Sequence, residues 1–179
     1  DGITGSLDIM KSDGGVMSVD VAVRTPAQMI ESGPAAGVMA SARLAKLTGH
    51  PNLITFDMGG TTAKASVLEG GLPTWTTEYE VGEGITLSSK LTKGRGHALR
   101  LPVIDLAEVG TGGGSIVRVD EGGGIKVGPE SSGANPGPAC YNIGGTEPTV
   151  TDANVALGYL NPDELAGGNL KIEGSLALD

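Results

Sequence analysis

Apolar residues along this chain occur in short runs that are separated by turns rich in glycine. Alternation of apolar and polar positions, together with β-branched residues, predicts strands in several of these runs. The expected strands cover residues 3–10, 74–81 and part of 99–109, and two hairpins are expected over 53–68 and 116–127. Residues 82–96 are polar and bear Lys90, Lys93 and Arg95, so this stretch is expected to form a mobile loop.

Helical periodicity appears in a few segments between the strands. Residues 26–31 predict a short helix that stops at Ser32-Gly33, and a longer helix is expected from there to Gly49. Pro34 suits the first position of the longer helix, where a missing N–H costs nothing. Its core-facing side is predicted by the helical spacing of Val38, Ala42 and Ala45.

One face of the longer helix carries small side chains, namely Ala36, Gly37, Ala40 and Ser41. Small residues allow a helix to pack closely on a sheet, and this is the favoured interpretation of the face. The alternative is that the helix N-terminus near Ser32-Gly33 points its free N–H groups at a phosphate. A further helix is expected over residues 153–159, with Thr151-Asp152 as its cap.

The hairpin over residues 53–68 is the stretch that carries the most chemical information. An apolar run rich in β-formers ends at Asp57, two glycines and two threonines follow, and a second run leads to Val67 and Leu68. This order predicts a strand, a tight turn and a second strand, with Asp57 at the tip of the hairpin.

The tip has the composition of a phosphate-binding turn. Glycines let the backbone approach a ligand closely, and successive N–H groups can form a concave anion site. Asp57 is a candidate for holding a hydrated Mg²⁺, and Thr61 and Thr62 add hydroxyl donors. The turn is not a Walker A loop, because no Gly-Lys-Ser/Thr closes it and no helix follows. The alternative is an ordinary tight hairpin with an Asx-type turn.

A second glycine cluster, Gly112-Gly113-Gly114-Ser115, precedes the hairpin over 116–127. It does not fit the dinucleotide-binding fingerprint, because Ser115 occupies the position of the third glycine and no helix follows. Two interpretations stay open at this point. The cluster is either a bend that allows close packing or a second loop that faces a ligand.

Residues 128–149 are dense in Gly, Pro, Ser and Asn, and a loop of this length is usually functional or disordered. Its composition suits an ordered loop that lines a cleft. Cys140 has no base or cation near it in sequence, which favours a structural role over a nucleophilic one. Asp152 and Asn154 follow the loop and are alternative oxygen ligands for a metal or a substrate.

Composition narrows the classes of function. Glycine accounts for 31 of 179 residues, which indicates many turns and close backbone approaches. The net charge of −9 argues against a nucleic-acid-binding surface. A single cysteine excludes an internal disulfide, and no signal peptide or apolar run of transmembrane length occurs. A soluble cytoplasmic protein is therefore the expectation.

Four segments together resemble the hydantoinase A/5-oxoprolinase family, which includes N-methylhydantoinase A-type subunits and is related to subunits of acetone and acetophenone carboxylases. The segments occur in the family's order and span most of the chain. They are Ser32-Gly33-Pro34-Ala35-Ala36-Gly37, Asp57-Met58-Gly59-Gly60-Thr61-Thr62, Gly112-Gly113-Gly114-Ser115, and Pro136–Tyr141 followed by Thr149–Asn154.

The resemblance implies a fold and a reaction. The implied fold is α/β, a mixed sheet with β-hairpins and packed helices, like one ribonuclease-H-like lobe of the actin, sugar-kinase and Hsp70 ATPases. The implied reaction uses ATP and Mg²⁺ to phosphorylate a cyclic amide or related carbonyl for hydrolytic ring opening, with a hydantoinase B-type partner subunit. The alternatives are an ATP-dependent ketone carboxylase subunit and a non-catalytic scaffold lobe that binds a partner subunit.

The resemblance also assigns residues to these roles. Asp57 is the expected catalytic residue and metal ligand, and Asp152 is a second metal candidate. Lys64 departs from the aspartate often found near its position in the family, and it is expected to face either phosphate or solvent. The expected nucleotide-binding residues are Gly59, Gly60, Thr61, Thr62, Gly112, Gly113, Gly114 and Ser115.

Finally, the resemblance implies that residues 1–179 are a single-domain fragment. The family carries a first phosphate hairpin on the N-terminal side and an adenosine-contacting segment on the C-terminal side, and neither is present. The chain also opens at Asp1 without a methionine. We therefore expect little or no activity from these residues alone.

Overall fold

The computed structural model describes residues 4–81 and 97–178, so the loop expected over 82–96 lies outside the described residues. The chain groups into two compact units by its internal contacts, and the single-domain interpretation stays a prediction. The first comprises residues 1–57 and 64–108, and the second comprises residues 58–63 and 109–179. The central hairpin thus contributes its stem to the first unit and its tip to the second.

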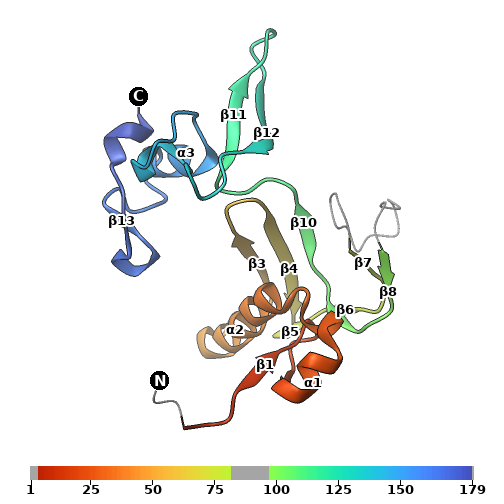
Figure 1. Ribbon diagram of the computed structural model, residues 1–179. Coiled ribbons are helices and arrows are strands. Elements are labelled where there is room, and N and C mark those ends of the chain that lie inside the picture. Colours follow the sequence, from red (N-terminus) through yellow and green to blue (C-terminus); the bar gives the residue numbers. More distant parts are fainter. Residues whose placement is uncertain (1–3, 82–96, 179) are drawn as a thin grey trace. The chain divides into compact units, whose positions relative to one another are not determined.

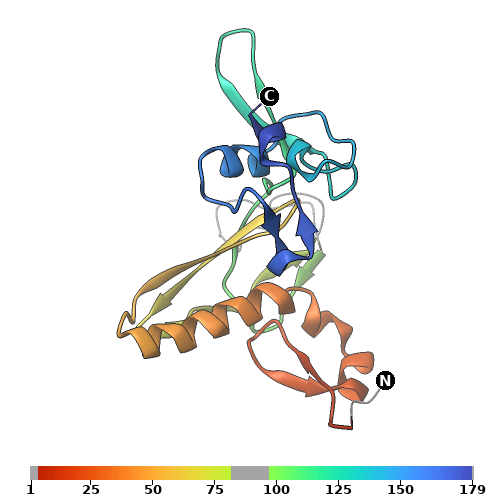
Figure 2. The ribbon, with the colours of Figure 1, turned by 90° about the vertical axis from the view of Figure 1, so that its left-hand side faces the viewer.

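The first unit combines short strands with one long helix, α2 (Ser32–Thr48), shown in orange in Figures 1 and 2. Before α2 lie β1 (Asp8–Met10), β2 (Val16–Ser18), α1 (Val19–Arg24) and a 3₁₀ turn (Pro26–Met29). After it come β3 (Leu53–Met58), β4 (Ala63–Glu69), β5 (Leu72–Pro73), β6 (Trp75–Thr76), β7 (Tyr79–Val81), β8 (His97–Leu99), β9 (Val103–Ile104) and β10 (Ala107–Val109).

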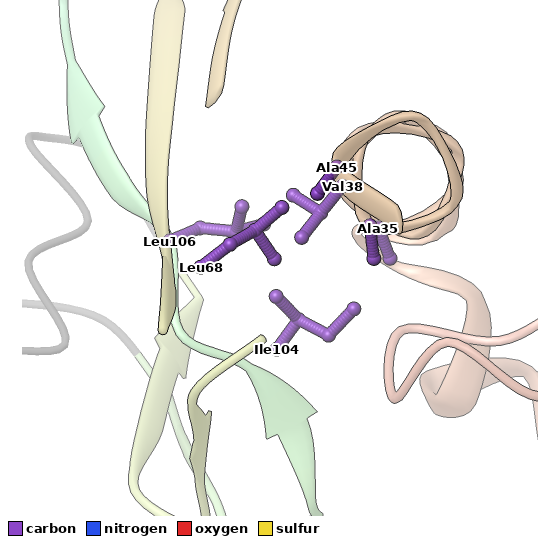
Figure 3. Packing of buried hydrophobic residues seen from close by; sticks show 7 residues of the cluster. Ala35, Val38, Ala45, Leu68, Ile104 and Leu106 are labelled. Carbon is purple, nitrogen blue, oxygen red and sulfur yellow. The ribbon is translucent and has the colours of Figure 1, made fainter. Parts of the chain in front are cut away.

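Helix α2 ends where the sequence predicts, because Gly49 adopts a left-handed φ of 73° that glycine tolerates without strain. Its core-facing side is also confirmed. Figure 3 shows Ala35, Val38 and Ala45 pointing from α2 toward side chains on the sheet side. The buried cluster consists of Ala35, Val38, Ala42, Ala45, Leu68, Ile104 and Leu106.

The small residues on α2 do not make the close contact with the sheet that the sequence predicts. Gly37 and Ala40 are exposed, and a Cβ atom added at Gly37 would have no heavy atom within 4 Å. The prediction that this face packs closely on the sheet is therefore wrong. Alanines and Val38 on the adjacent face take that contact instead, because the helix rotates its more apolar side into the core.

The principal sheet has the strand order β10-β4-β3, and β5 pairs with β4. Along β3 and β4 buried and exposed positions tend to alternate, as expected for a sheet covered on one face. Leu68 is fully buried on the helix side, whereas Ile54 and Phe56 are 77% and 65% exposed. The predicted central hairpin is confirmed.

The strand predicted over residues 74–81 forms as two separate strands. Strand β6 pairs with β9, whereas β7 pairs with β8, so the segment changes partner at residues 77–78. Sequence periodicity describes one segment at a time and does not register a change of partner. The N-terminal strand is likewise shorter than expected, because pairing with β2 spans Asp8–Met10.

The second unit contains the hairpin of β11 (Ser115–Val119) and β12 (Ile125–Ser131), which reaches out from the rest of this unit in Figure 2. This hairpin confirms the prediction for residues 116–127. Its other elements are α3 (Val150–Ala156), β13 (Glu164–Leu165), β14 (Leu170–Lys171) and 3₁₀ turns at Ala139–Tyr141, Ala166–Gly168 and Gly174–Ala177.

Helix α3 begins earlier than the sequence analysis expects. Thr149, not Asp152, is the N-cap, and Asp152 occupies the third helical position in a reciprocal capping box. The helix predicted over 153–159 is therefore shifted toward the N-terminus. The predicted α/β class, with hairpins and packed helices, is confirmed. Within the described part of the chain, no helix has the length and apolar composition needed to span a bilayer.

Candidate functional site

The tip of the β3–β4 hairpin forms a tight turn with open N–H groups. The N–H of Gly59 donates to the carbonyl oxygen of Thr62 at 3.0 Å, which closes the turn. Gly60 and Thr61 are exposed, and among the described residues no hydrogen bond takes up either N–H group. Two adjacent, solvent-facing N–H groups are the elements of an anion-binding nest.

The second glycine cluster packs directly against this turn. The N–H of Gly113 donates to the carbonyl oxygen of Gly59 at 2.9 Å, and the N–H of Gly114 donates to that of Gly60 at 2.7 Å. These bonds leave the N–H groups of the tip untouched and hold its carbonyl oxygens. We call the segment Gly112–Ser115 the glycine clasp, because it holds the turn in place.

The absence of side chains in the clasp is required for this contact. A Cβ atom at position 112 would lie 2.6 Å from the carbonyl carbon of Thr61 and 2.6 Å from the nitrogen of Thr62. A Cβ at position 113 would lie 2.7 Å from the hydroxyl oxygen of Thr151. Backbone atoms cannot move aside as a flexible side chain can, so the first of these contacts demands glycine.

All the N–H groups of the clasp are engaged within the protein. The N–H of Gly112 donates to the hydroxyl oxygen of Ser115 at 2.9 Å, and the N–H of Ser115 donates to the carbonyl oxygen of Gly112 at 3.0 Å. Direct nucleotide binding by this segment stays a prediction. Of the two interpretations left open by the sequence, these contacts favour the bend that allows close packing.

The clasp is anchored in turn to α3 and β12. The N–H of Thr151 donates to the carbonyl oxygen of Gly113 at 2.8 Å, and the N–H of Ser132 donates to that of Gly114 at 2.8 Å. The segment over 128–149 thus contributes to an ordered network around the hairpin tip. The bonds of Thr151 and Ser132 to the clasp are not predictable from the sequence, because the clasp lies far away from both residues along the chain.

Asp152 lies at the centre of a buried hydrogen-bond network. Its carboxylate accepts hydrogen bonds from the N–H groups of Ala139, Cys140 and Thr149 and from the Thr149 hydroxyl, at 2.7–3.2 Å. Burial alone would raise the pKa of Asp152, but the hydrogen bonds from Cys140 and Thr149 outweigh it and lower the pKa. Metal binding by Asp152 stays a prediction, and the engaged oxygens favour the capping role.

Cys140 is fully buried beside this carboxylate. Burial, together with the nearby Asp152, raises the pKa of the Cys140 thiol to about 12. The thiolate is the nucleophilic form, so this thiol is protonated and unreactive at neutral pH. The structural role favoured by the sequence agrees with this environment.

Asp57, at the end of β3, lines a cavity in the first unit between α2 and the sheet. The cavity has a volume of about 300 Å³, and its polar lining includes Ser41, Thr55, Asp57 and Lys64. The Asp57 side chain is exposed to solvent, so its carboxylate is accessible to a ligand.

The Lys64 side chain is largely buried and so does not face solvent, and a contact with phosphate stays a prediction. Its ammonium nitrogen lies 3.6 Å from a carboxylate oxygen of Glu31 and 3.5 Å from one of Glu108, and all three side chains are largely buried. Glu31 also accepts a hydrogen bond from the Tyr79 hydroxyl at 2.8 Å. Burial, and then the bond to Glu31, raise the pKa of Tyr79 above its usual range.

This cluster of Glu31, Lys64, Tyr79 and Glu108 is missing from the sequence analysis. Its members come from the start of α2 and from β4, β7 and β10, so no local pattern connects them. A sequence signal exists for each acid singly, since Glu31 precedes the long helix and Glu108 follows an apolar strand. Their convergence on Lys64 is a property of the fold.

A nucleotide with a hydrated metal is compatible with the residues at the hairpin. Within residues 4–81 and 97–178, no group of three or more histidine, cysteine or acidic side chains is arranged to hold a metal ion. Mg²⁺ does not need such a group, because it commonly uses one or two carboxylates, several waters and the phosphates of its nucleotide. Asp57 can supply the carboxylate, and the N–H groups of Gly60 and Thr61 can receive phosphate oxygens.

Known proteins match this chain in sequence. Residues 1–178 match the sequence model of the Hydantoinase/oxoprolinase family. A protein of Methanocaldococcus jannaschii is 50% identical over 176 residues, which are 98% of this chain and 26% of that protein. The alpha subunit of caprolactamase from Pseudomonas jessenii is 39% identical over 169 residues, which are 94% of this chain and 22% of the subunit.

Solved structures agree with the sequence matches. Nucleotide-free acetone carboxylase is similar with a TM-score of 0.72 and 29% identity, over 99% of this chain and 23% of the matched chain. The crystal structure of the ATP-dependent caprolactamase from Pseudomonas jessenii has a TM-score of 0.68 and 37% identity, over 99% of this chain and 24% of that one. The chain thus spans about a quarter of the length of these relatives.

Proposed function

This chain belongs to the hydantoinase/oxoprolinase family, and we propose that it supplies the phosphate-binding hairpin of a longer ATP-dependent enzyme. The enzyme would phosphorylate a cyclic amide, or a related carbonyl oxygen, and the activated ring would then open by hydrolysis. The observation that carries the proposal is the exposed pair of N–H groups at Gly60 and Thr61, held in place by the glycine clasp.

The residues of the hairpin divide the work as follows. Gly60 and Thr61 donate backbone hydrogen bonds to phosphate oxygens, and the Thr61 and Thr62 hydroxyls are additional donors. Asp57 would hold a hydrated Mg²⁺, and that ion would neutralise charge on the phosphates of ATP. The clasp, through Gly113 and Gly114, keeps the turn in one conformation so that its donors stay oriented toward the phosphates.

Two observations on relatives support this reaction class. The caprolactamase subunit and structure are named for an ATP-dependent reaction on a cyclic amide. Acetone carboxylase is named for ATP-dependent carboxylation of a ketone, which supports a ketone carboxylase subunit as the second candidate function. Both reactions start from a carbonyl group. The named subunits also support a partner subunit, for which we propose a hydantoinase B-type protein.

The experiment is ATP hydrolysis by the full-length parent protein with its partner subunit. Activity would be measured with hydantoin, ε-caprolactam, 5-oxoproline and acetone, for the wild type, Asp57→Ala and Asp57→Asn. Substrate-stimulated hydrolysis should fall by about 100-fold or more in both variants, because the metal loses its carboxylate. Asp20→Asn, which removes an exposed charge from the first turn of α1, is the matched control and should retain wild-type activity.

The outcomes separate the candidate functions. Stimulation by a cyclic amide supports the ring-opening enzyme, and stimulation by acetone with carboxylation supports the ketone carboxylase. Undiminished activity in the Asp57 variants would remove Asp57 from the chemistry. No turnover with any substrate would leave a non-catalytic scaffold lobe as the function. Residues 1–179 by themselves should show no stimulated hydrolysis.

A further inference from the structure

The cavity beside Asp57 lies where the side chains on the helix side of the sheet change from apolar to polar along the strands. Toward one end, Leu68 belongs with Ala42 and Ala45 to the apolar core. Toward the other end, β3 and β4 present Thr55, Asp57 and Lys64 to the cavity. There α2 contributes Gly37 and Ser41, whose small side chains leave the space unfilled.

The cavity is small and has both apolar and polar walls. Its volume of about 300 Å³ is at the lower end of the range for ligand pockets, which suits a compact molecule. Val38 and Leu106 provide apolar contacts, whereas Lys64 and Asp57 provide charge. A site of this kind suits a ligand with a short hydrocarbon part and a single strong acceptor.

The charges around the cavity decide what kind of acceptor fits. Glu31 and Glu108 carry two negative charges against the one positive charge of Lys64, so this group is negative overall even when a metal ion neutralises Asp57. A ligand that carries its own carboxylate would be repelled. The ammonium nitrogen of Lys64 lies between the two glutamates, 3.5 Å from a carboxylate oxygen of Glu108 and 3.6 Å from one of Glu31.

We infer that this cavity binds the carbonyl group of a small, uncharged amide or ketone, with the Lys64 ammonium directed at the carbonyl oxygen. The inference rests on the proposed function and narrows its substrate class. The hydrogen bond from the Lys64 ammonium orients this oxygen for attack on the terminal phosphorus of ATP, as the bond from that phosphorus to the ADP oxygen breaks. Neutral lactams and ketones fit the site, and 5-oxoproline, with its carboxylate, does not.

The first test fills the cavity in the full-length parent protein with its partner subunit. Gly37→Leu places a side chain where nothing lies within 4 Å, and it replaces glycine inside a helix by a better helix former. Ala40→Leu adds the same side chain at an exposed position of α2 outside the cavity lining, and it serves as the matched control. Ser41→Leu fills the same cavity from the next turn, should Gly37→Leu fail to fold.

For each variant, ε-caprolactam binding would be measured by ligand-observed NMR, its KM by steady-state kinetics, and ATP affinity separately. We expect Gly37→Leu to raise the KM and weaken binding of ε-caprolactam by about tenfold or more. The ATP affinity of Gly37→Leu should stay at the wild-type value. Ala40→Leu should keep wild-type values for both lactam binding and ATP affinity. Wild-type lactam binding in folded Gly37→Leu and Ser41→Leu would overturn the inference.

The second test changes the charge of the cavity. Glu108→Gln removes one of the two negative charges next to Lys64 and keeps the shape of the side chain. The preference for ε-caprolactam over 5-oxoproline, as the ratio of kcat/KM values, should fall by about fivefold or more. An unchanged ratio, or a wild type that prefers 5-oxoproline, would contradict the inference. A wild type that binds ε-caprolactam but hydrolyses no ATP would contradict the proposed function and leave this site standing.

Discussion

The two glycine-rich segments of the second unit have nearly the same composition and opposite surroundings. Gly59 and Gly60 lie exposed at the hairpin tip, where the N–H of Gly60 has no partner among the described residues. Gly112, Gly113 and Gly114 are buried, and every N–H of the three is engaged within the protein. Glycine leaves the backbone of the tip open to a ligand, whereas in the clasp it permits backbone-to-backbone contact.

The difference shows why a glycine cluster by itself does not identify a ligand site. What separates the two segments is the destination of their N–H groups. At the tip the N–H groups of Gly60 and Thr61 remain available to an anion, whereas in the clasp the N–H groups of Gly113 and Gly114 fix the tip. The clasp therefore has a positioning role, and the tip has the binding role.

The largest expected loss of stability comes from a side chain placed between the clasp and the tip. Gly112→Ala places a methyl group 2.6 Å from backbone atoms of Thr61 and Thr62, so one segment must move. We expect a loss of unfolding free energy of about 3 kcal/mol, together with weaker nucleotide binding, because the turn is displaced. Urea denaturation of the full-length protein measures the first effect.

A matched control for this substitution lies in α2. Gly33→Ala adds the same methyl group where no heavy atom lies within 4 Å. It should raise stability by about 0.5–1 kcal/mol, because alanine is the better helix former. Equal stability of the two variants would show that the clasp does not pack as tightly as described.

Asp152 supports the clasp through α3, and its substitution should cause the second-largest loss of stability. Asp152→Asn keeps the shape but converts an acceptor into a partial donor that faces the N–H groups of Ala139, Cys140 and Thr149. We expect a loss of about 2 kcal/mol of stability at pH 7, as for a buried charged hydrogen-bond partner and a helix cap.

The stability that Asp152 contributes should also depend on pH. The pKa of Asp152 is lower in the folded state than its ordinary value of 3.8, so its contribution is fully present above that value. The contribution is lost as the pH falls below 3.8 toward the folded-state pKa. The stability difference between wild type and Asp152→Asn should therefore shrink in acid. A difference that stays constant from pH 7 to pH 2.5 would argue against the buried carboxylate network.

The smallest expected change in stability belongs to the tip. Gly60→Ala adds a methyl group with no heavy atom within 4 Å, so unfolding free energy should change by less than about 0.5 kcal/mol. Nucleotide affinity should nevertheless fall by about tenfold, because the methyl group occupies the surface that approaches phosphate. If Gly60→Ala lowered stability but left nucleotide affinity unchanged, the tip would have the structural role that we assign to the clasp.

Local features of this fold are readable from the sequence. The hairpin over 53–68, the stop of α2 at Gly49 and the helix face of Val38, Ala42 and Ala45 follow from turn chemistry, capping and periodicity. The expected cap at Asp152 was misplaced by three residues, because a capping box contains two polar residues that each resemble a cap. Asp152 is the second of them.

Long-range features are not readable in the same way. The role of Gly112 depends on Thr61 and Thr62, about fifty residues earlier in the chain. Lys64 meets its two glutamates only once α2 and β10 are both in place. The sequence could show that each residue was unusual. Tertiary packing decides which residue each of them contacts.

A crystal structure of the full-length protein with a non-hydrolysable ATP analogue and Mg²⁺ would show which N–H groups bind phosphate. We expect phosphate oxygens within hydrogen-bond distance of the N–H groups of Gly60 and Thr61. The bonds from Gly113 to Gly59 and from Gly114 to Gly60 should remain intact. Phosphates bound instead by the N–H groups of Gly112–Ser115, with those two bonds broken, would contradict this expectation.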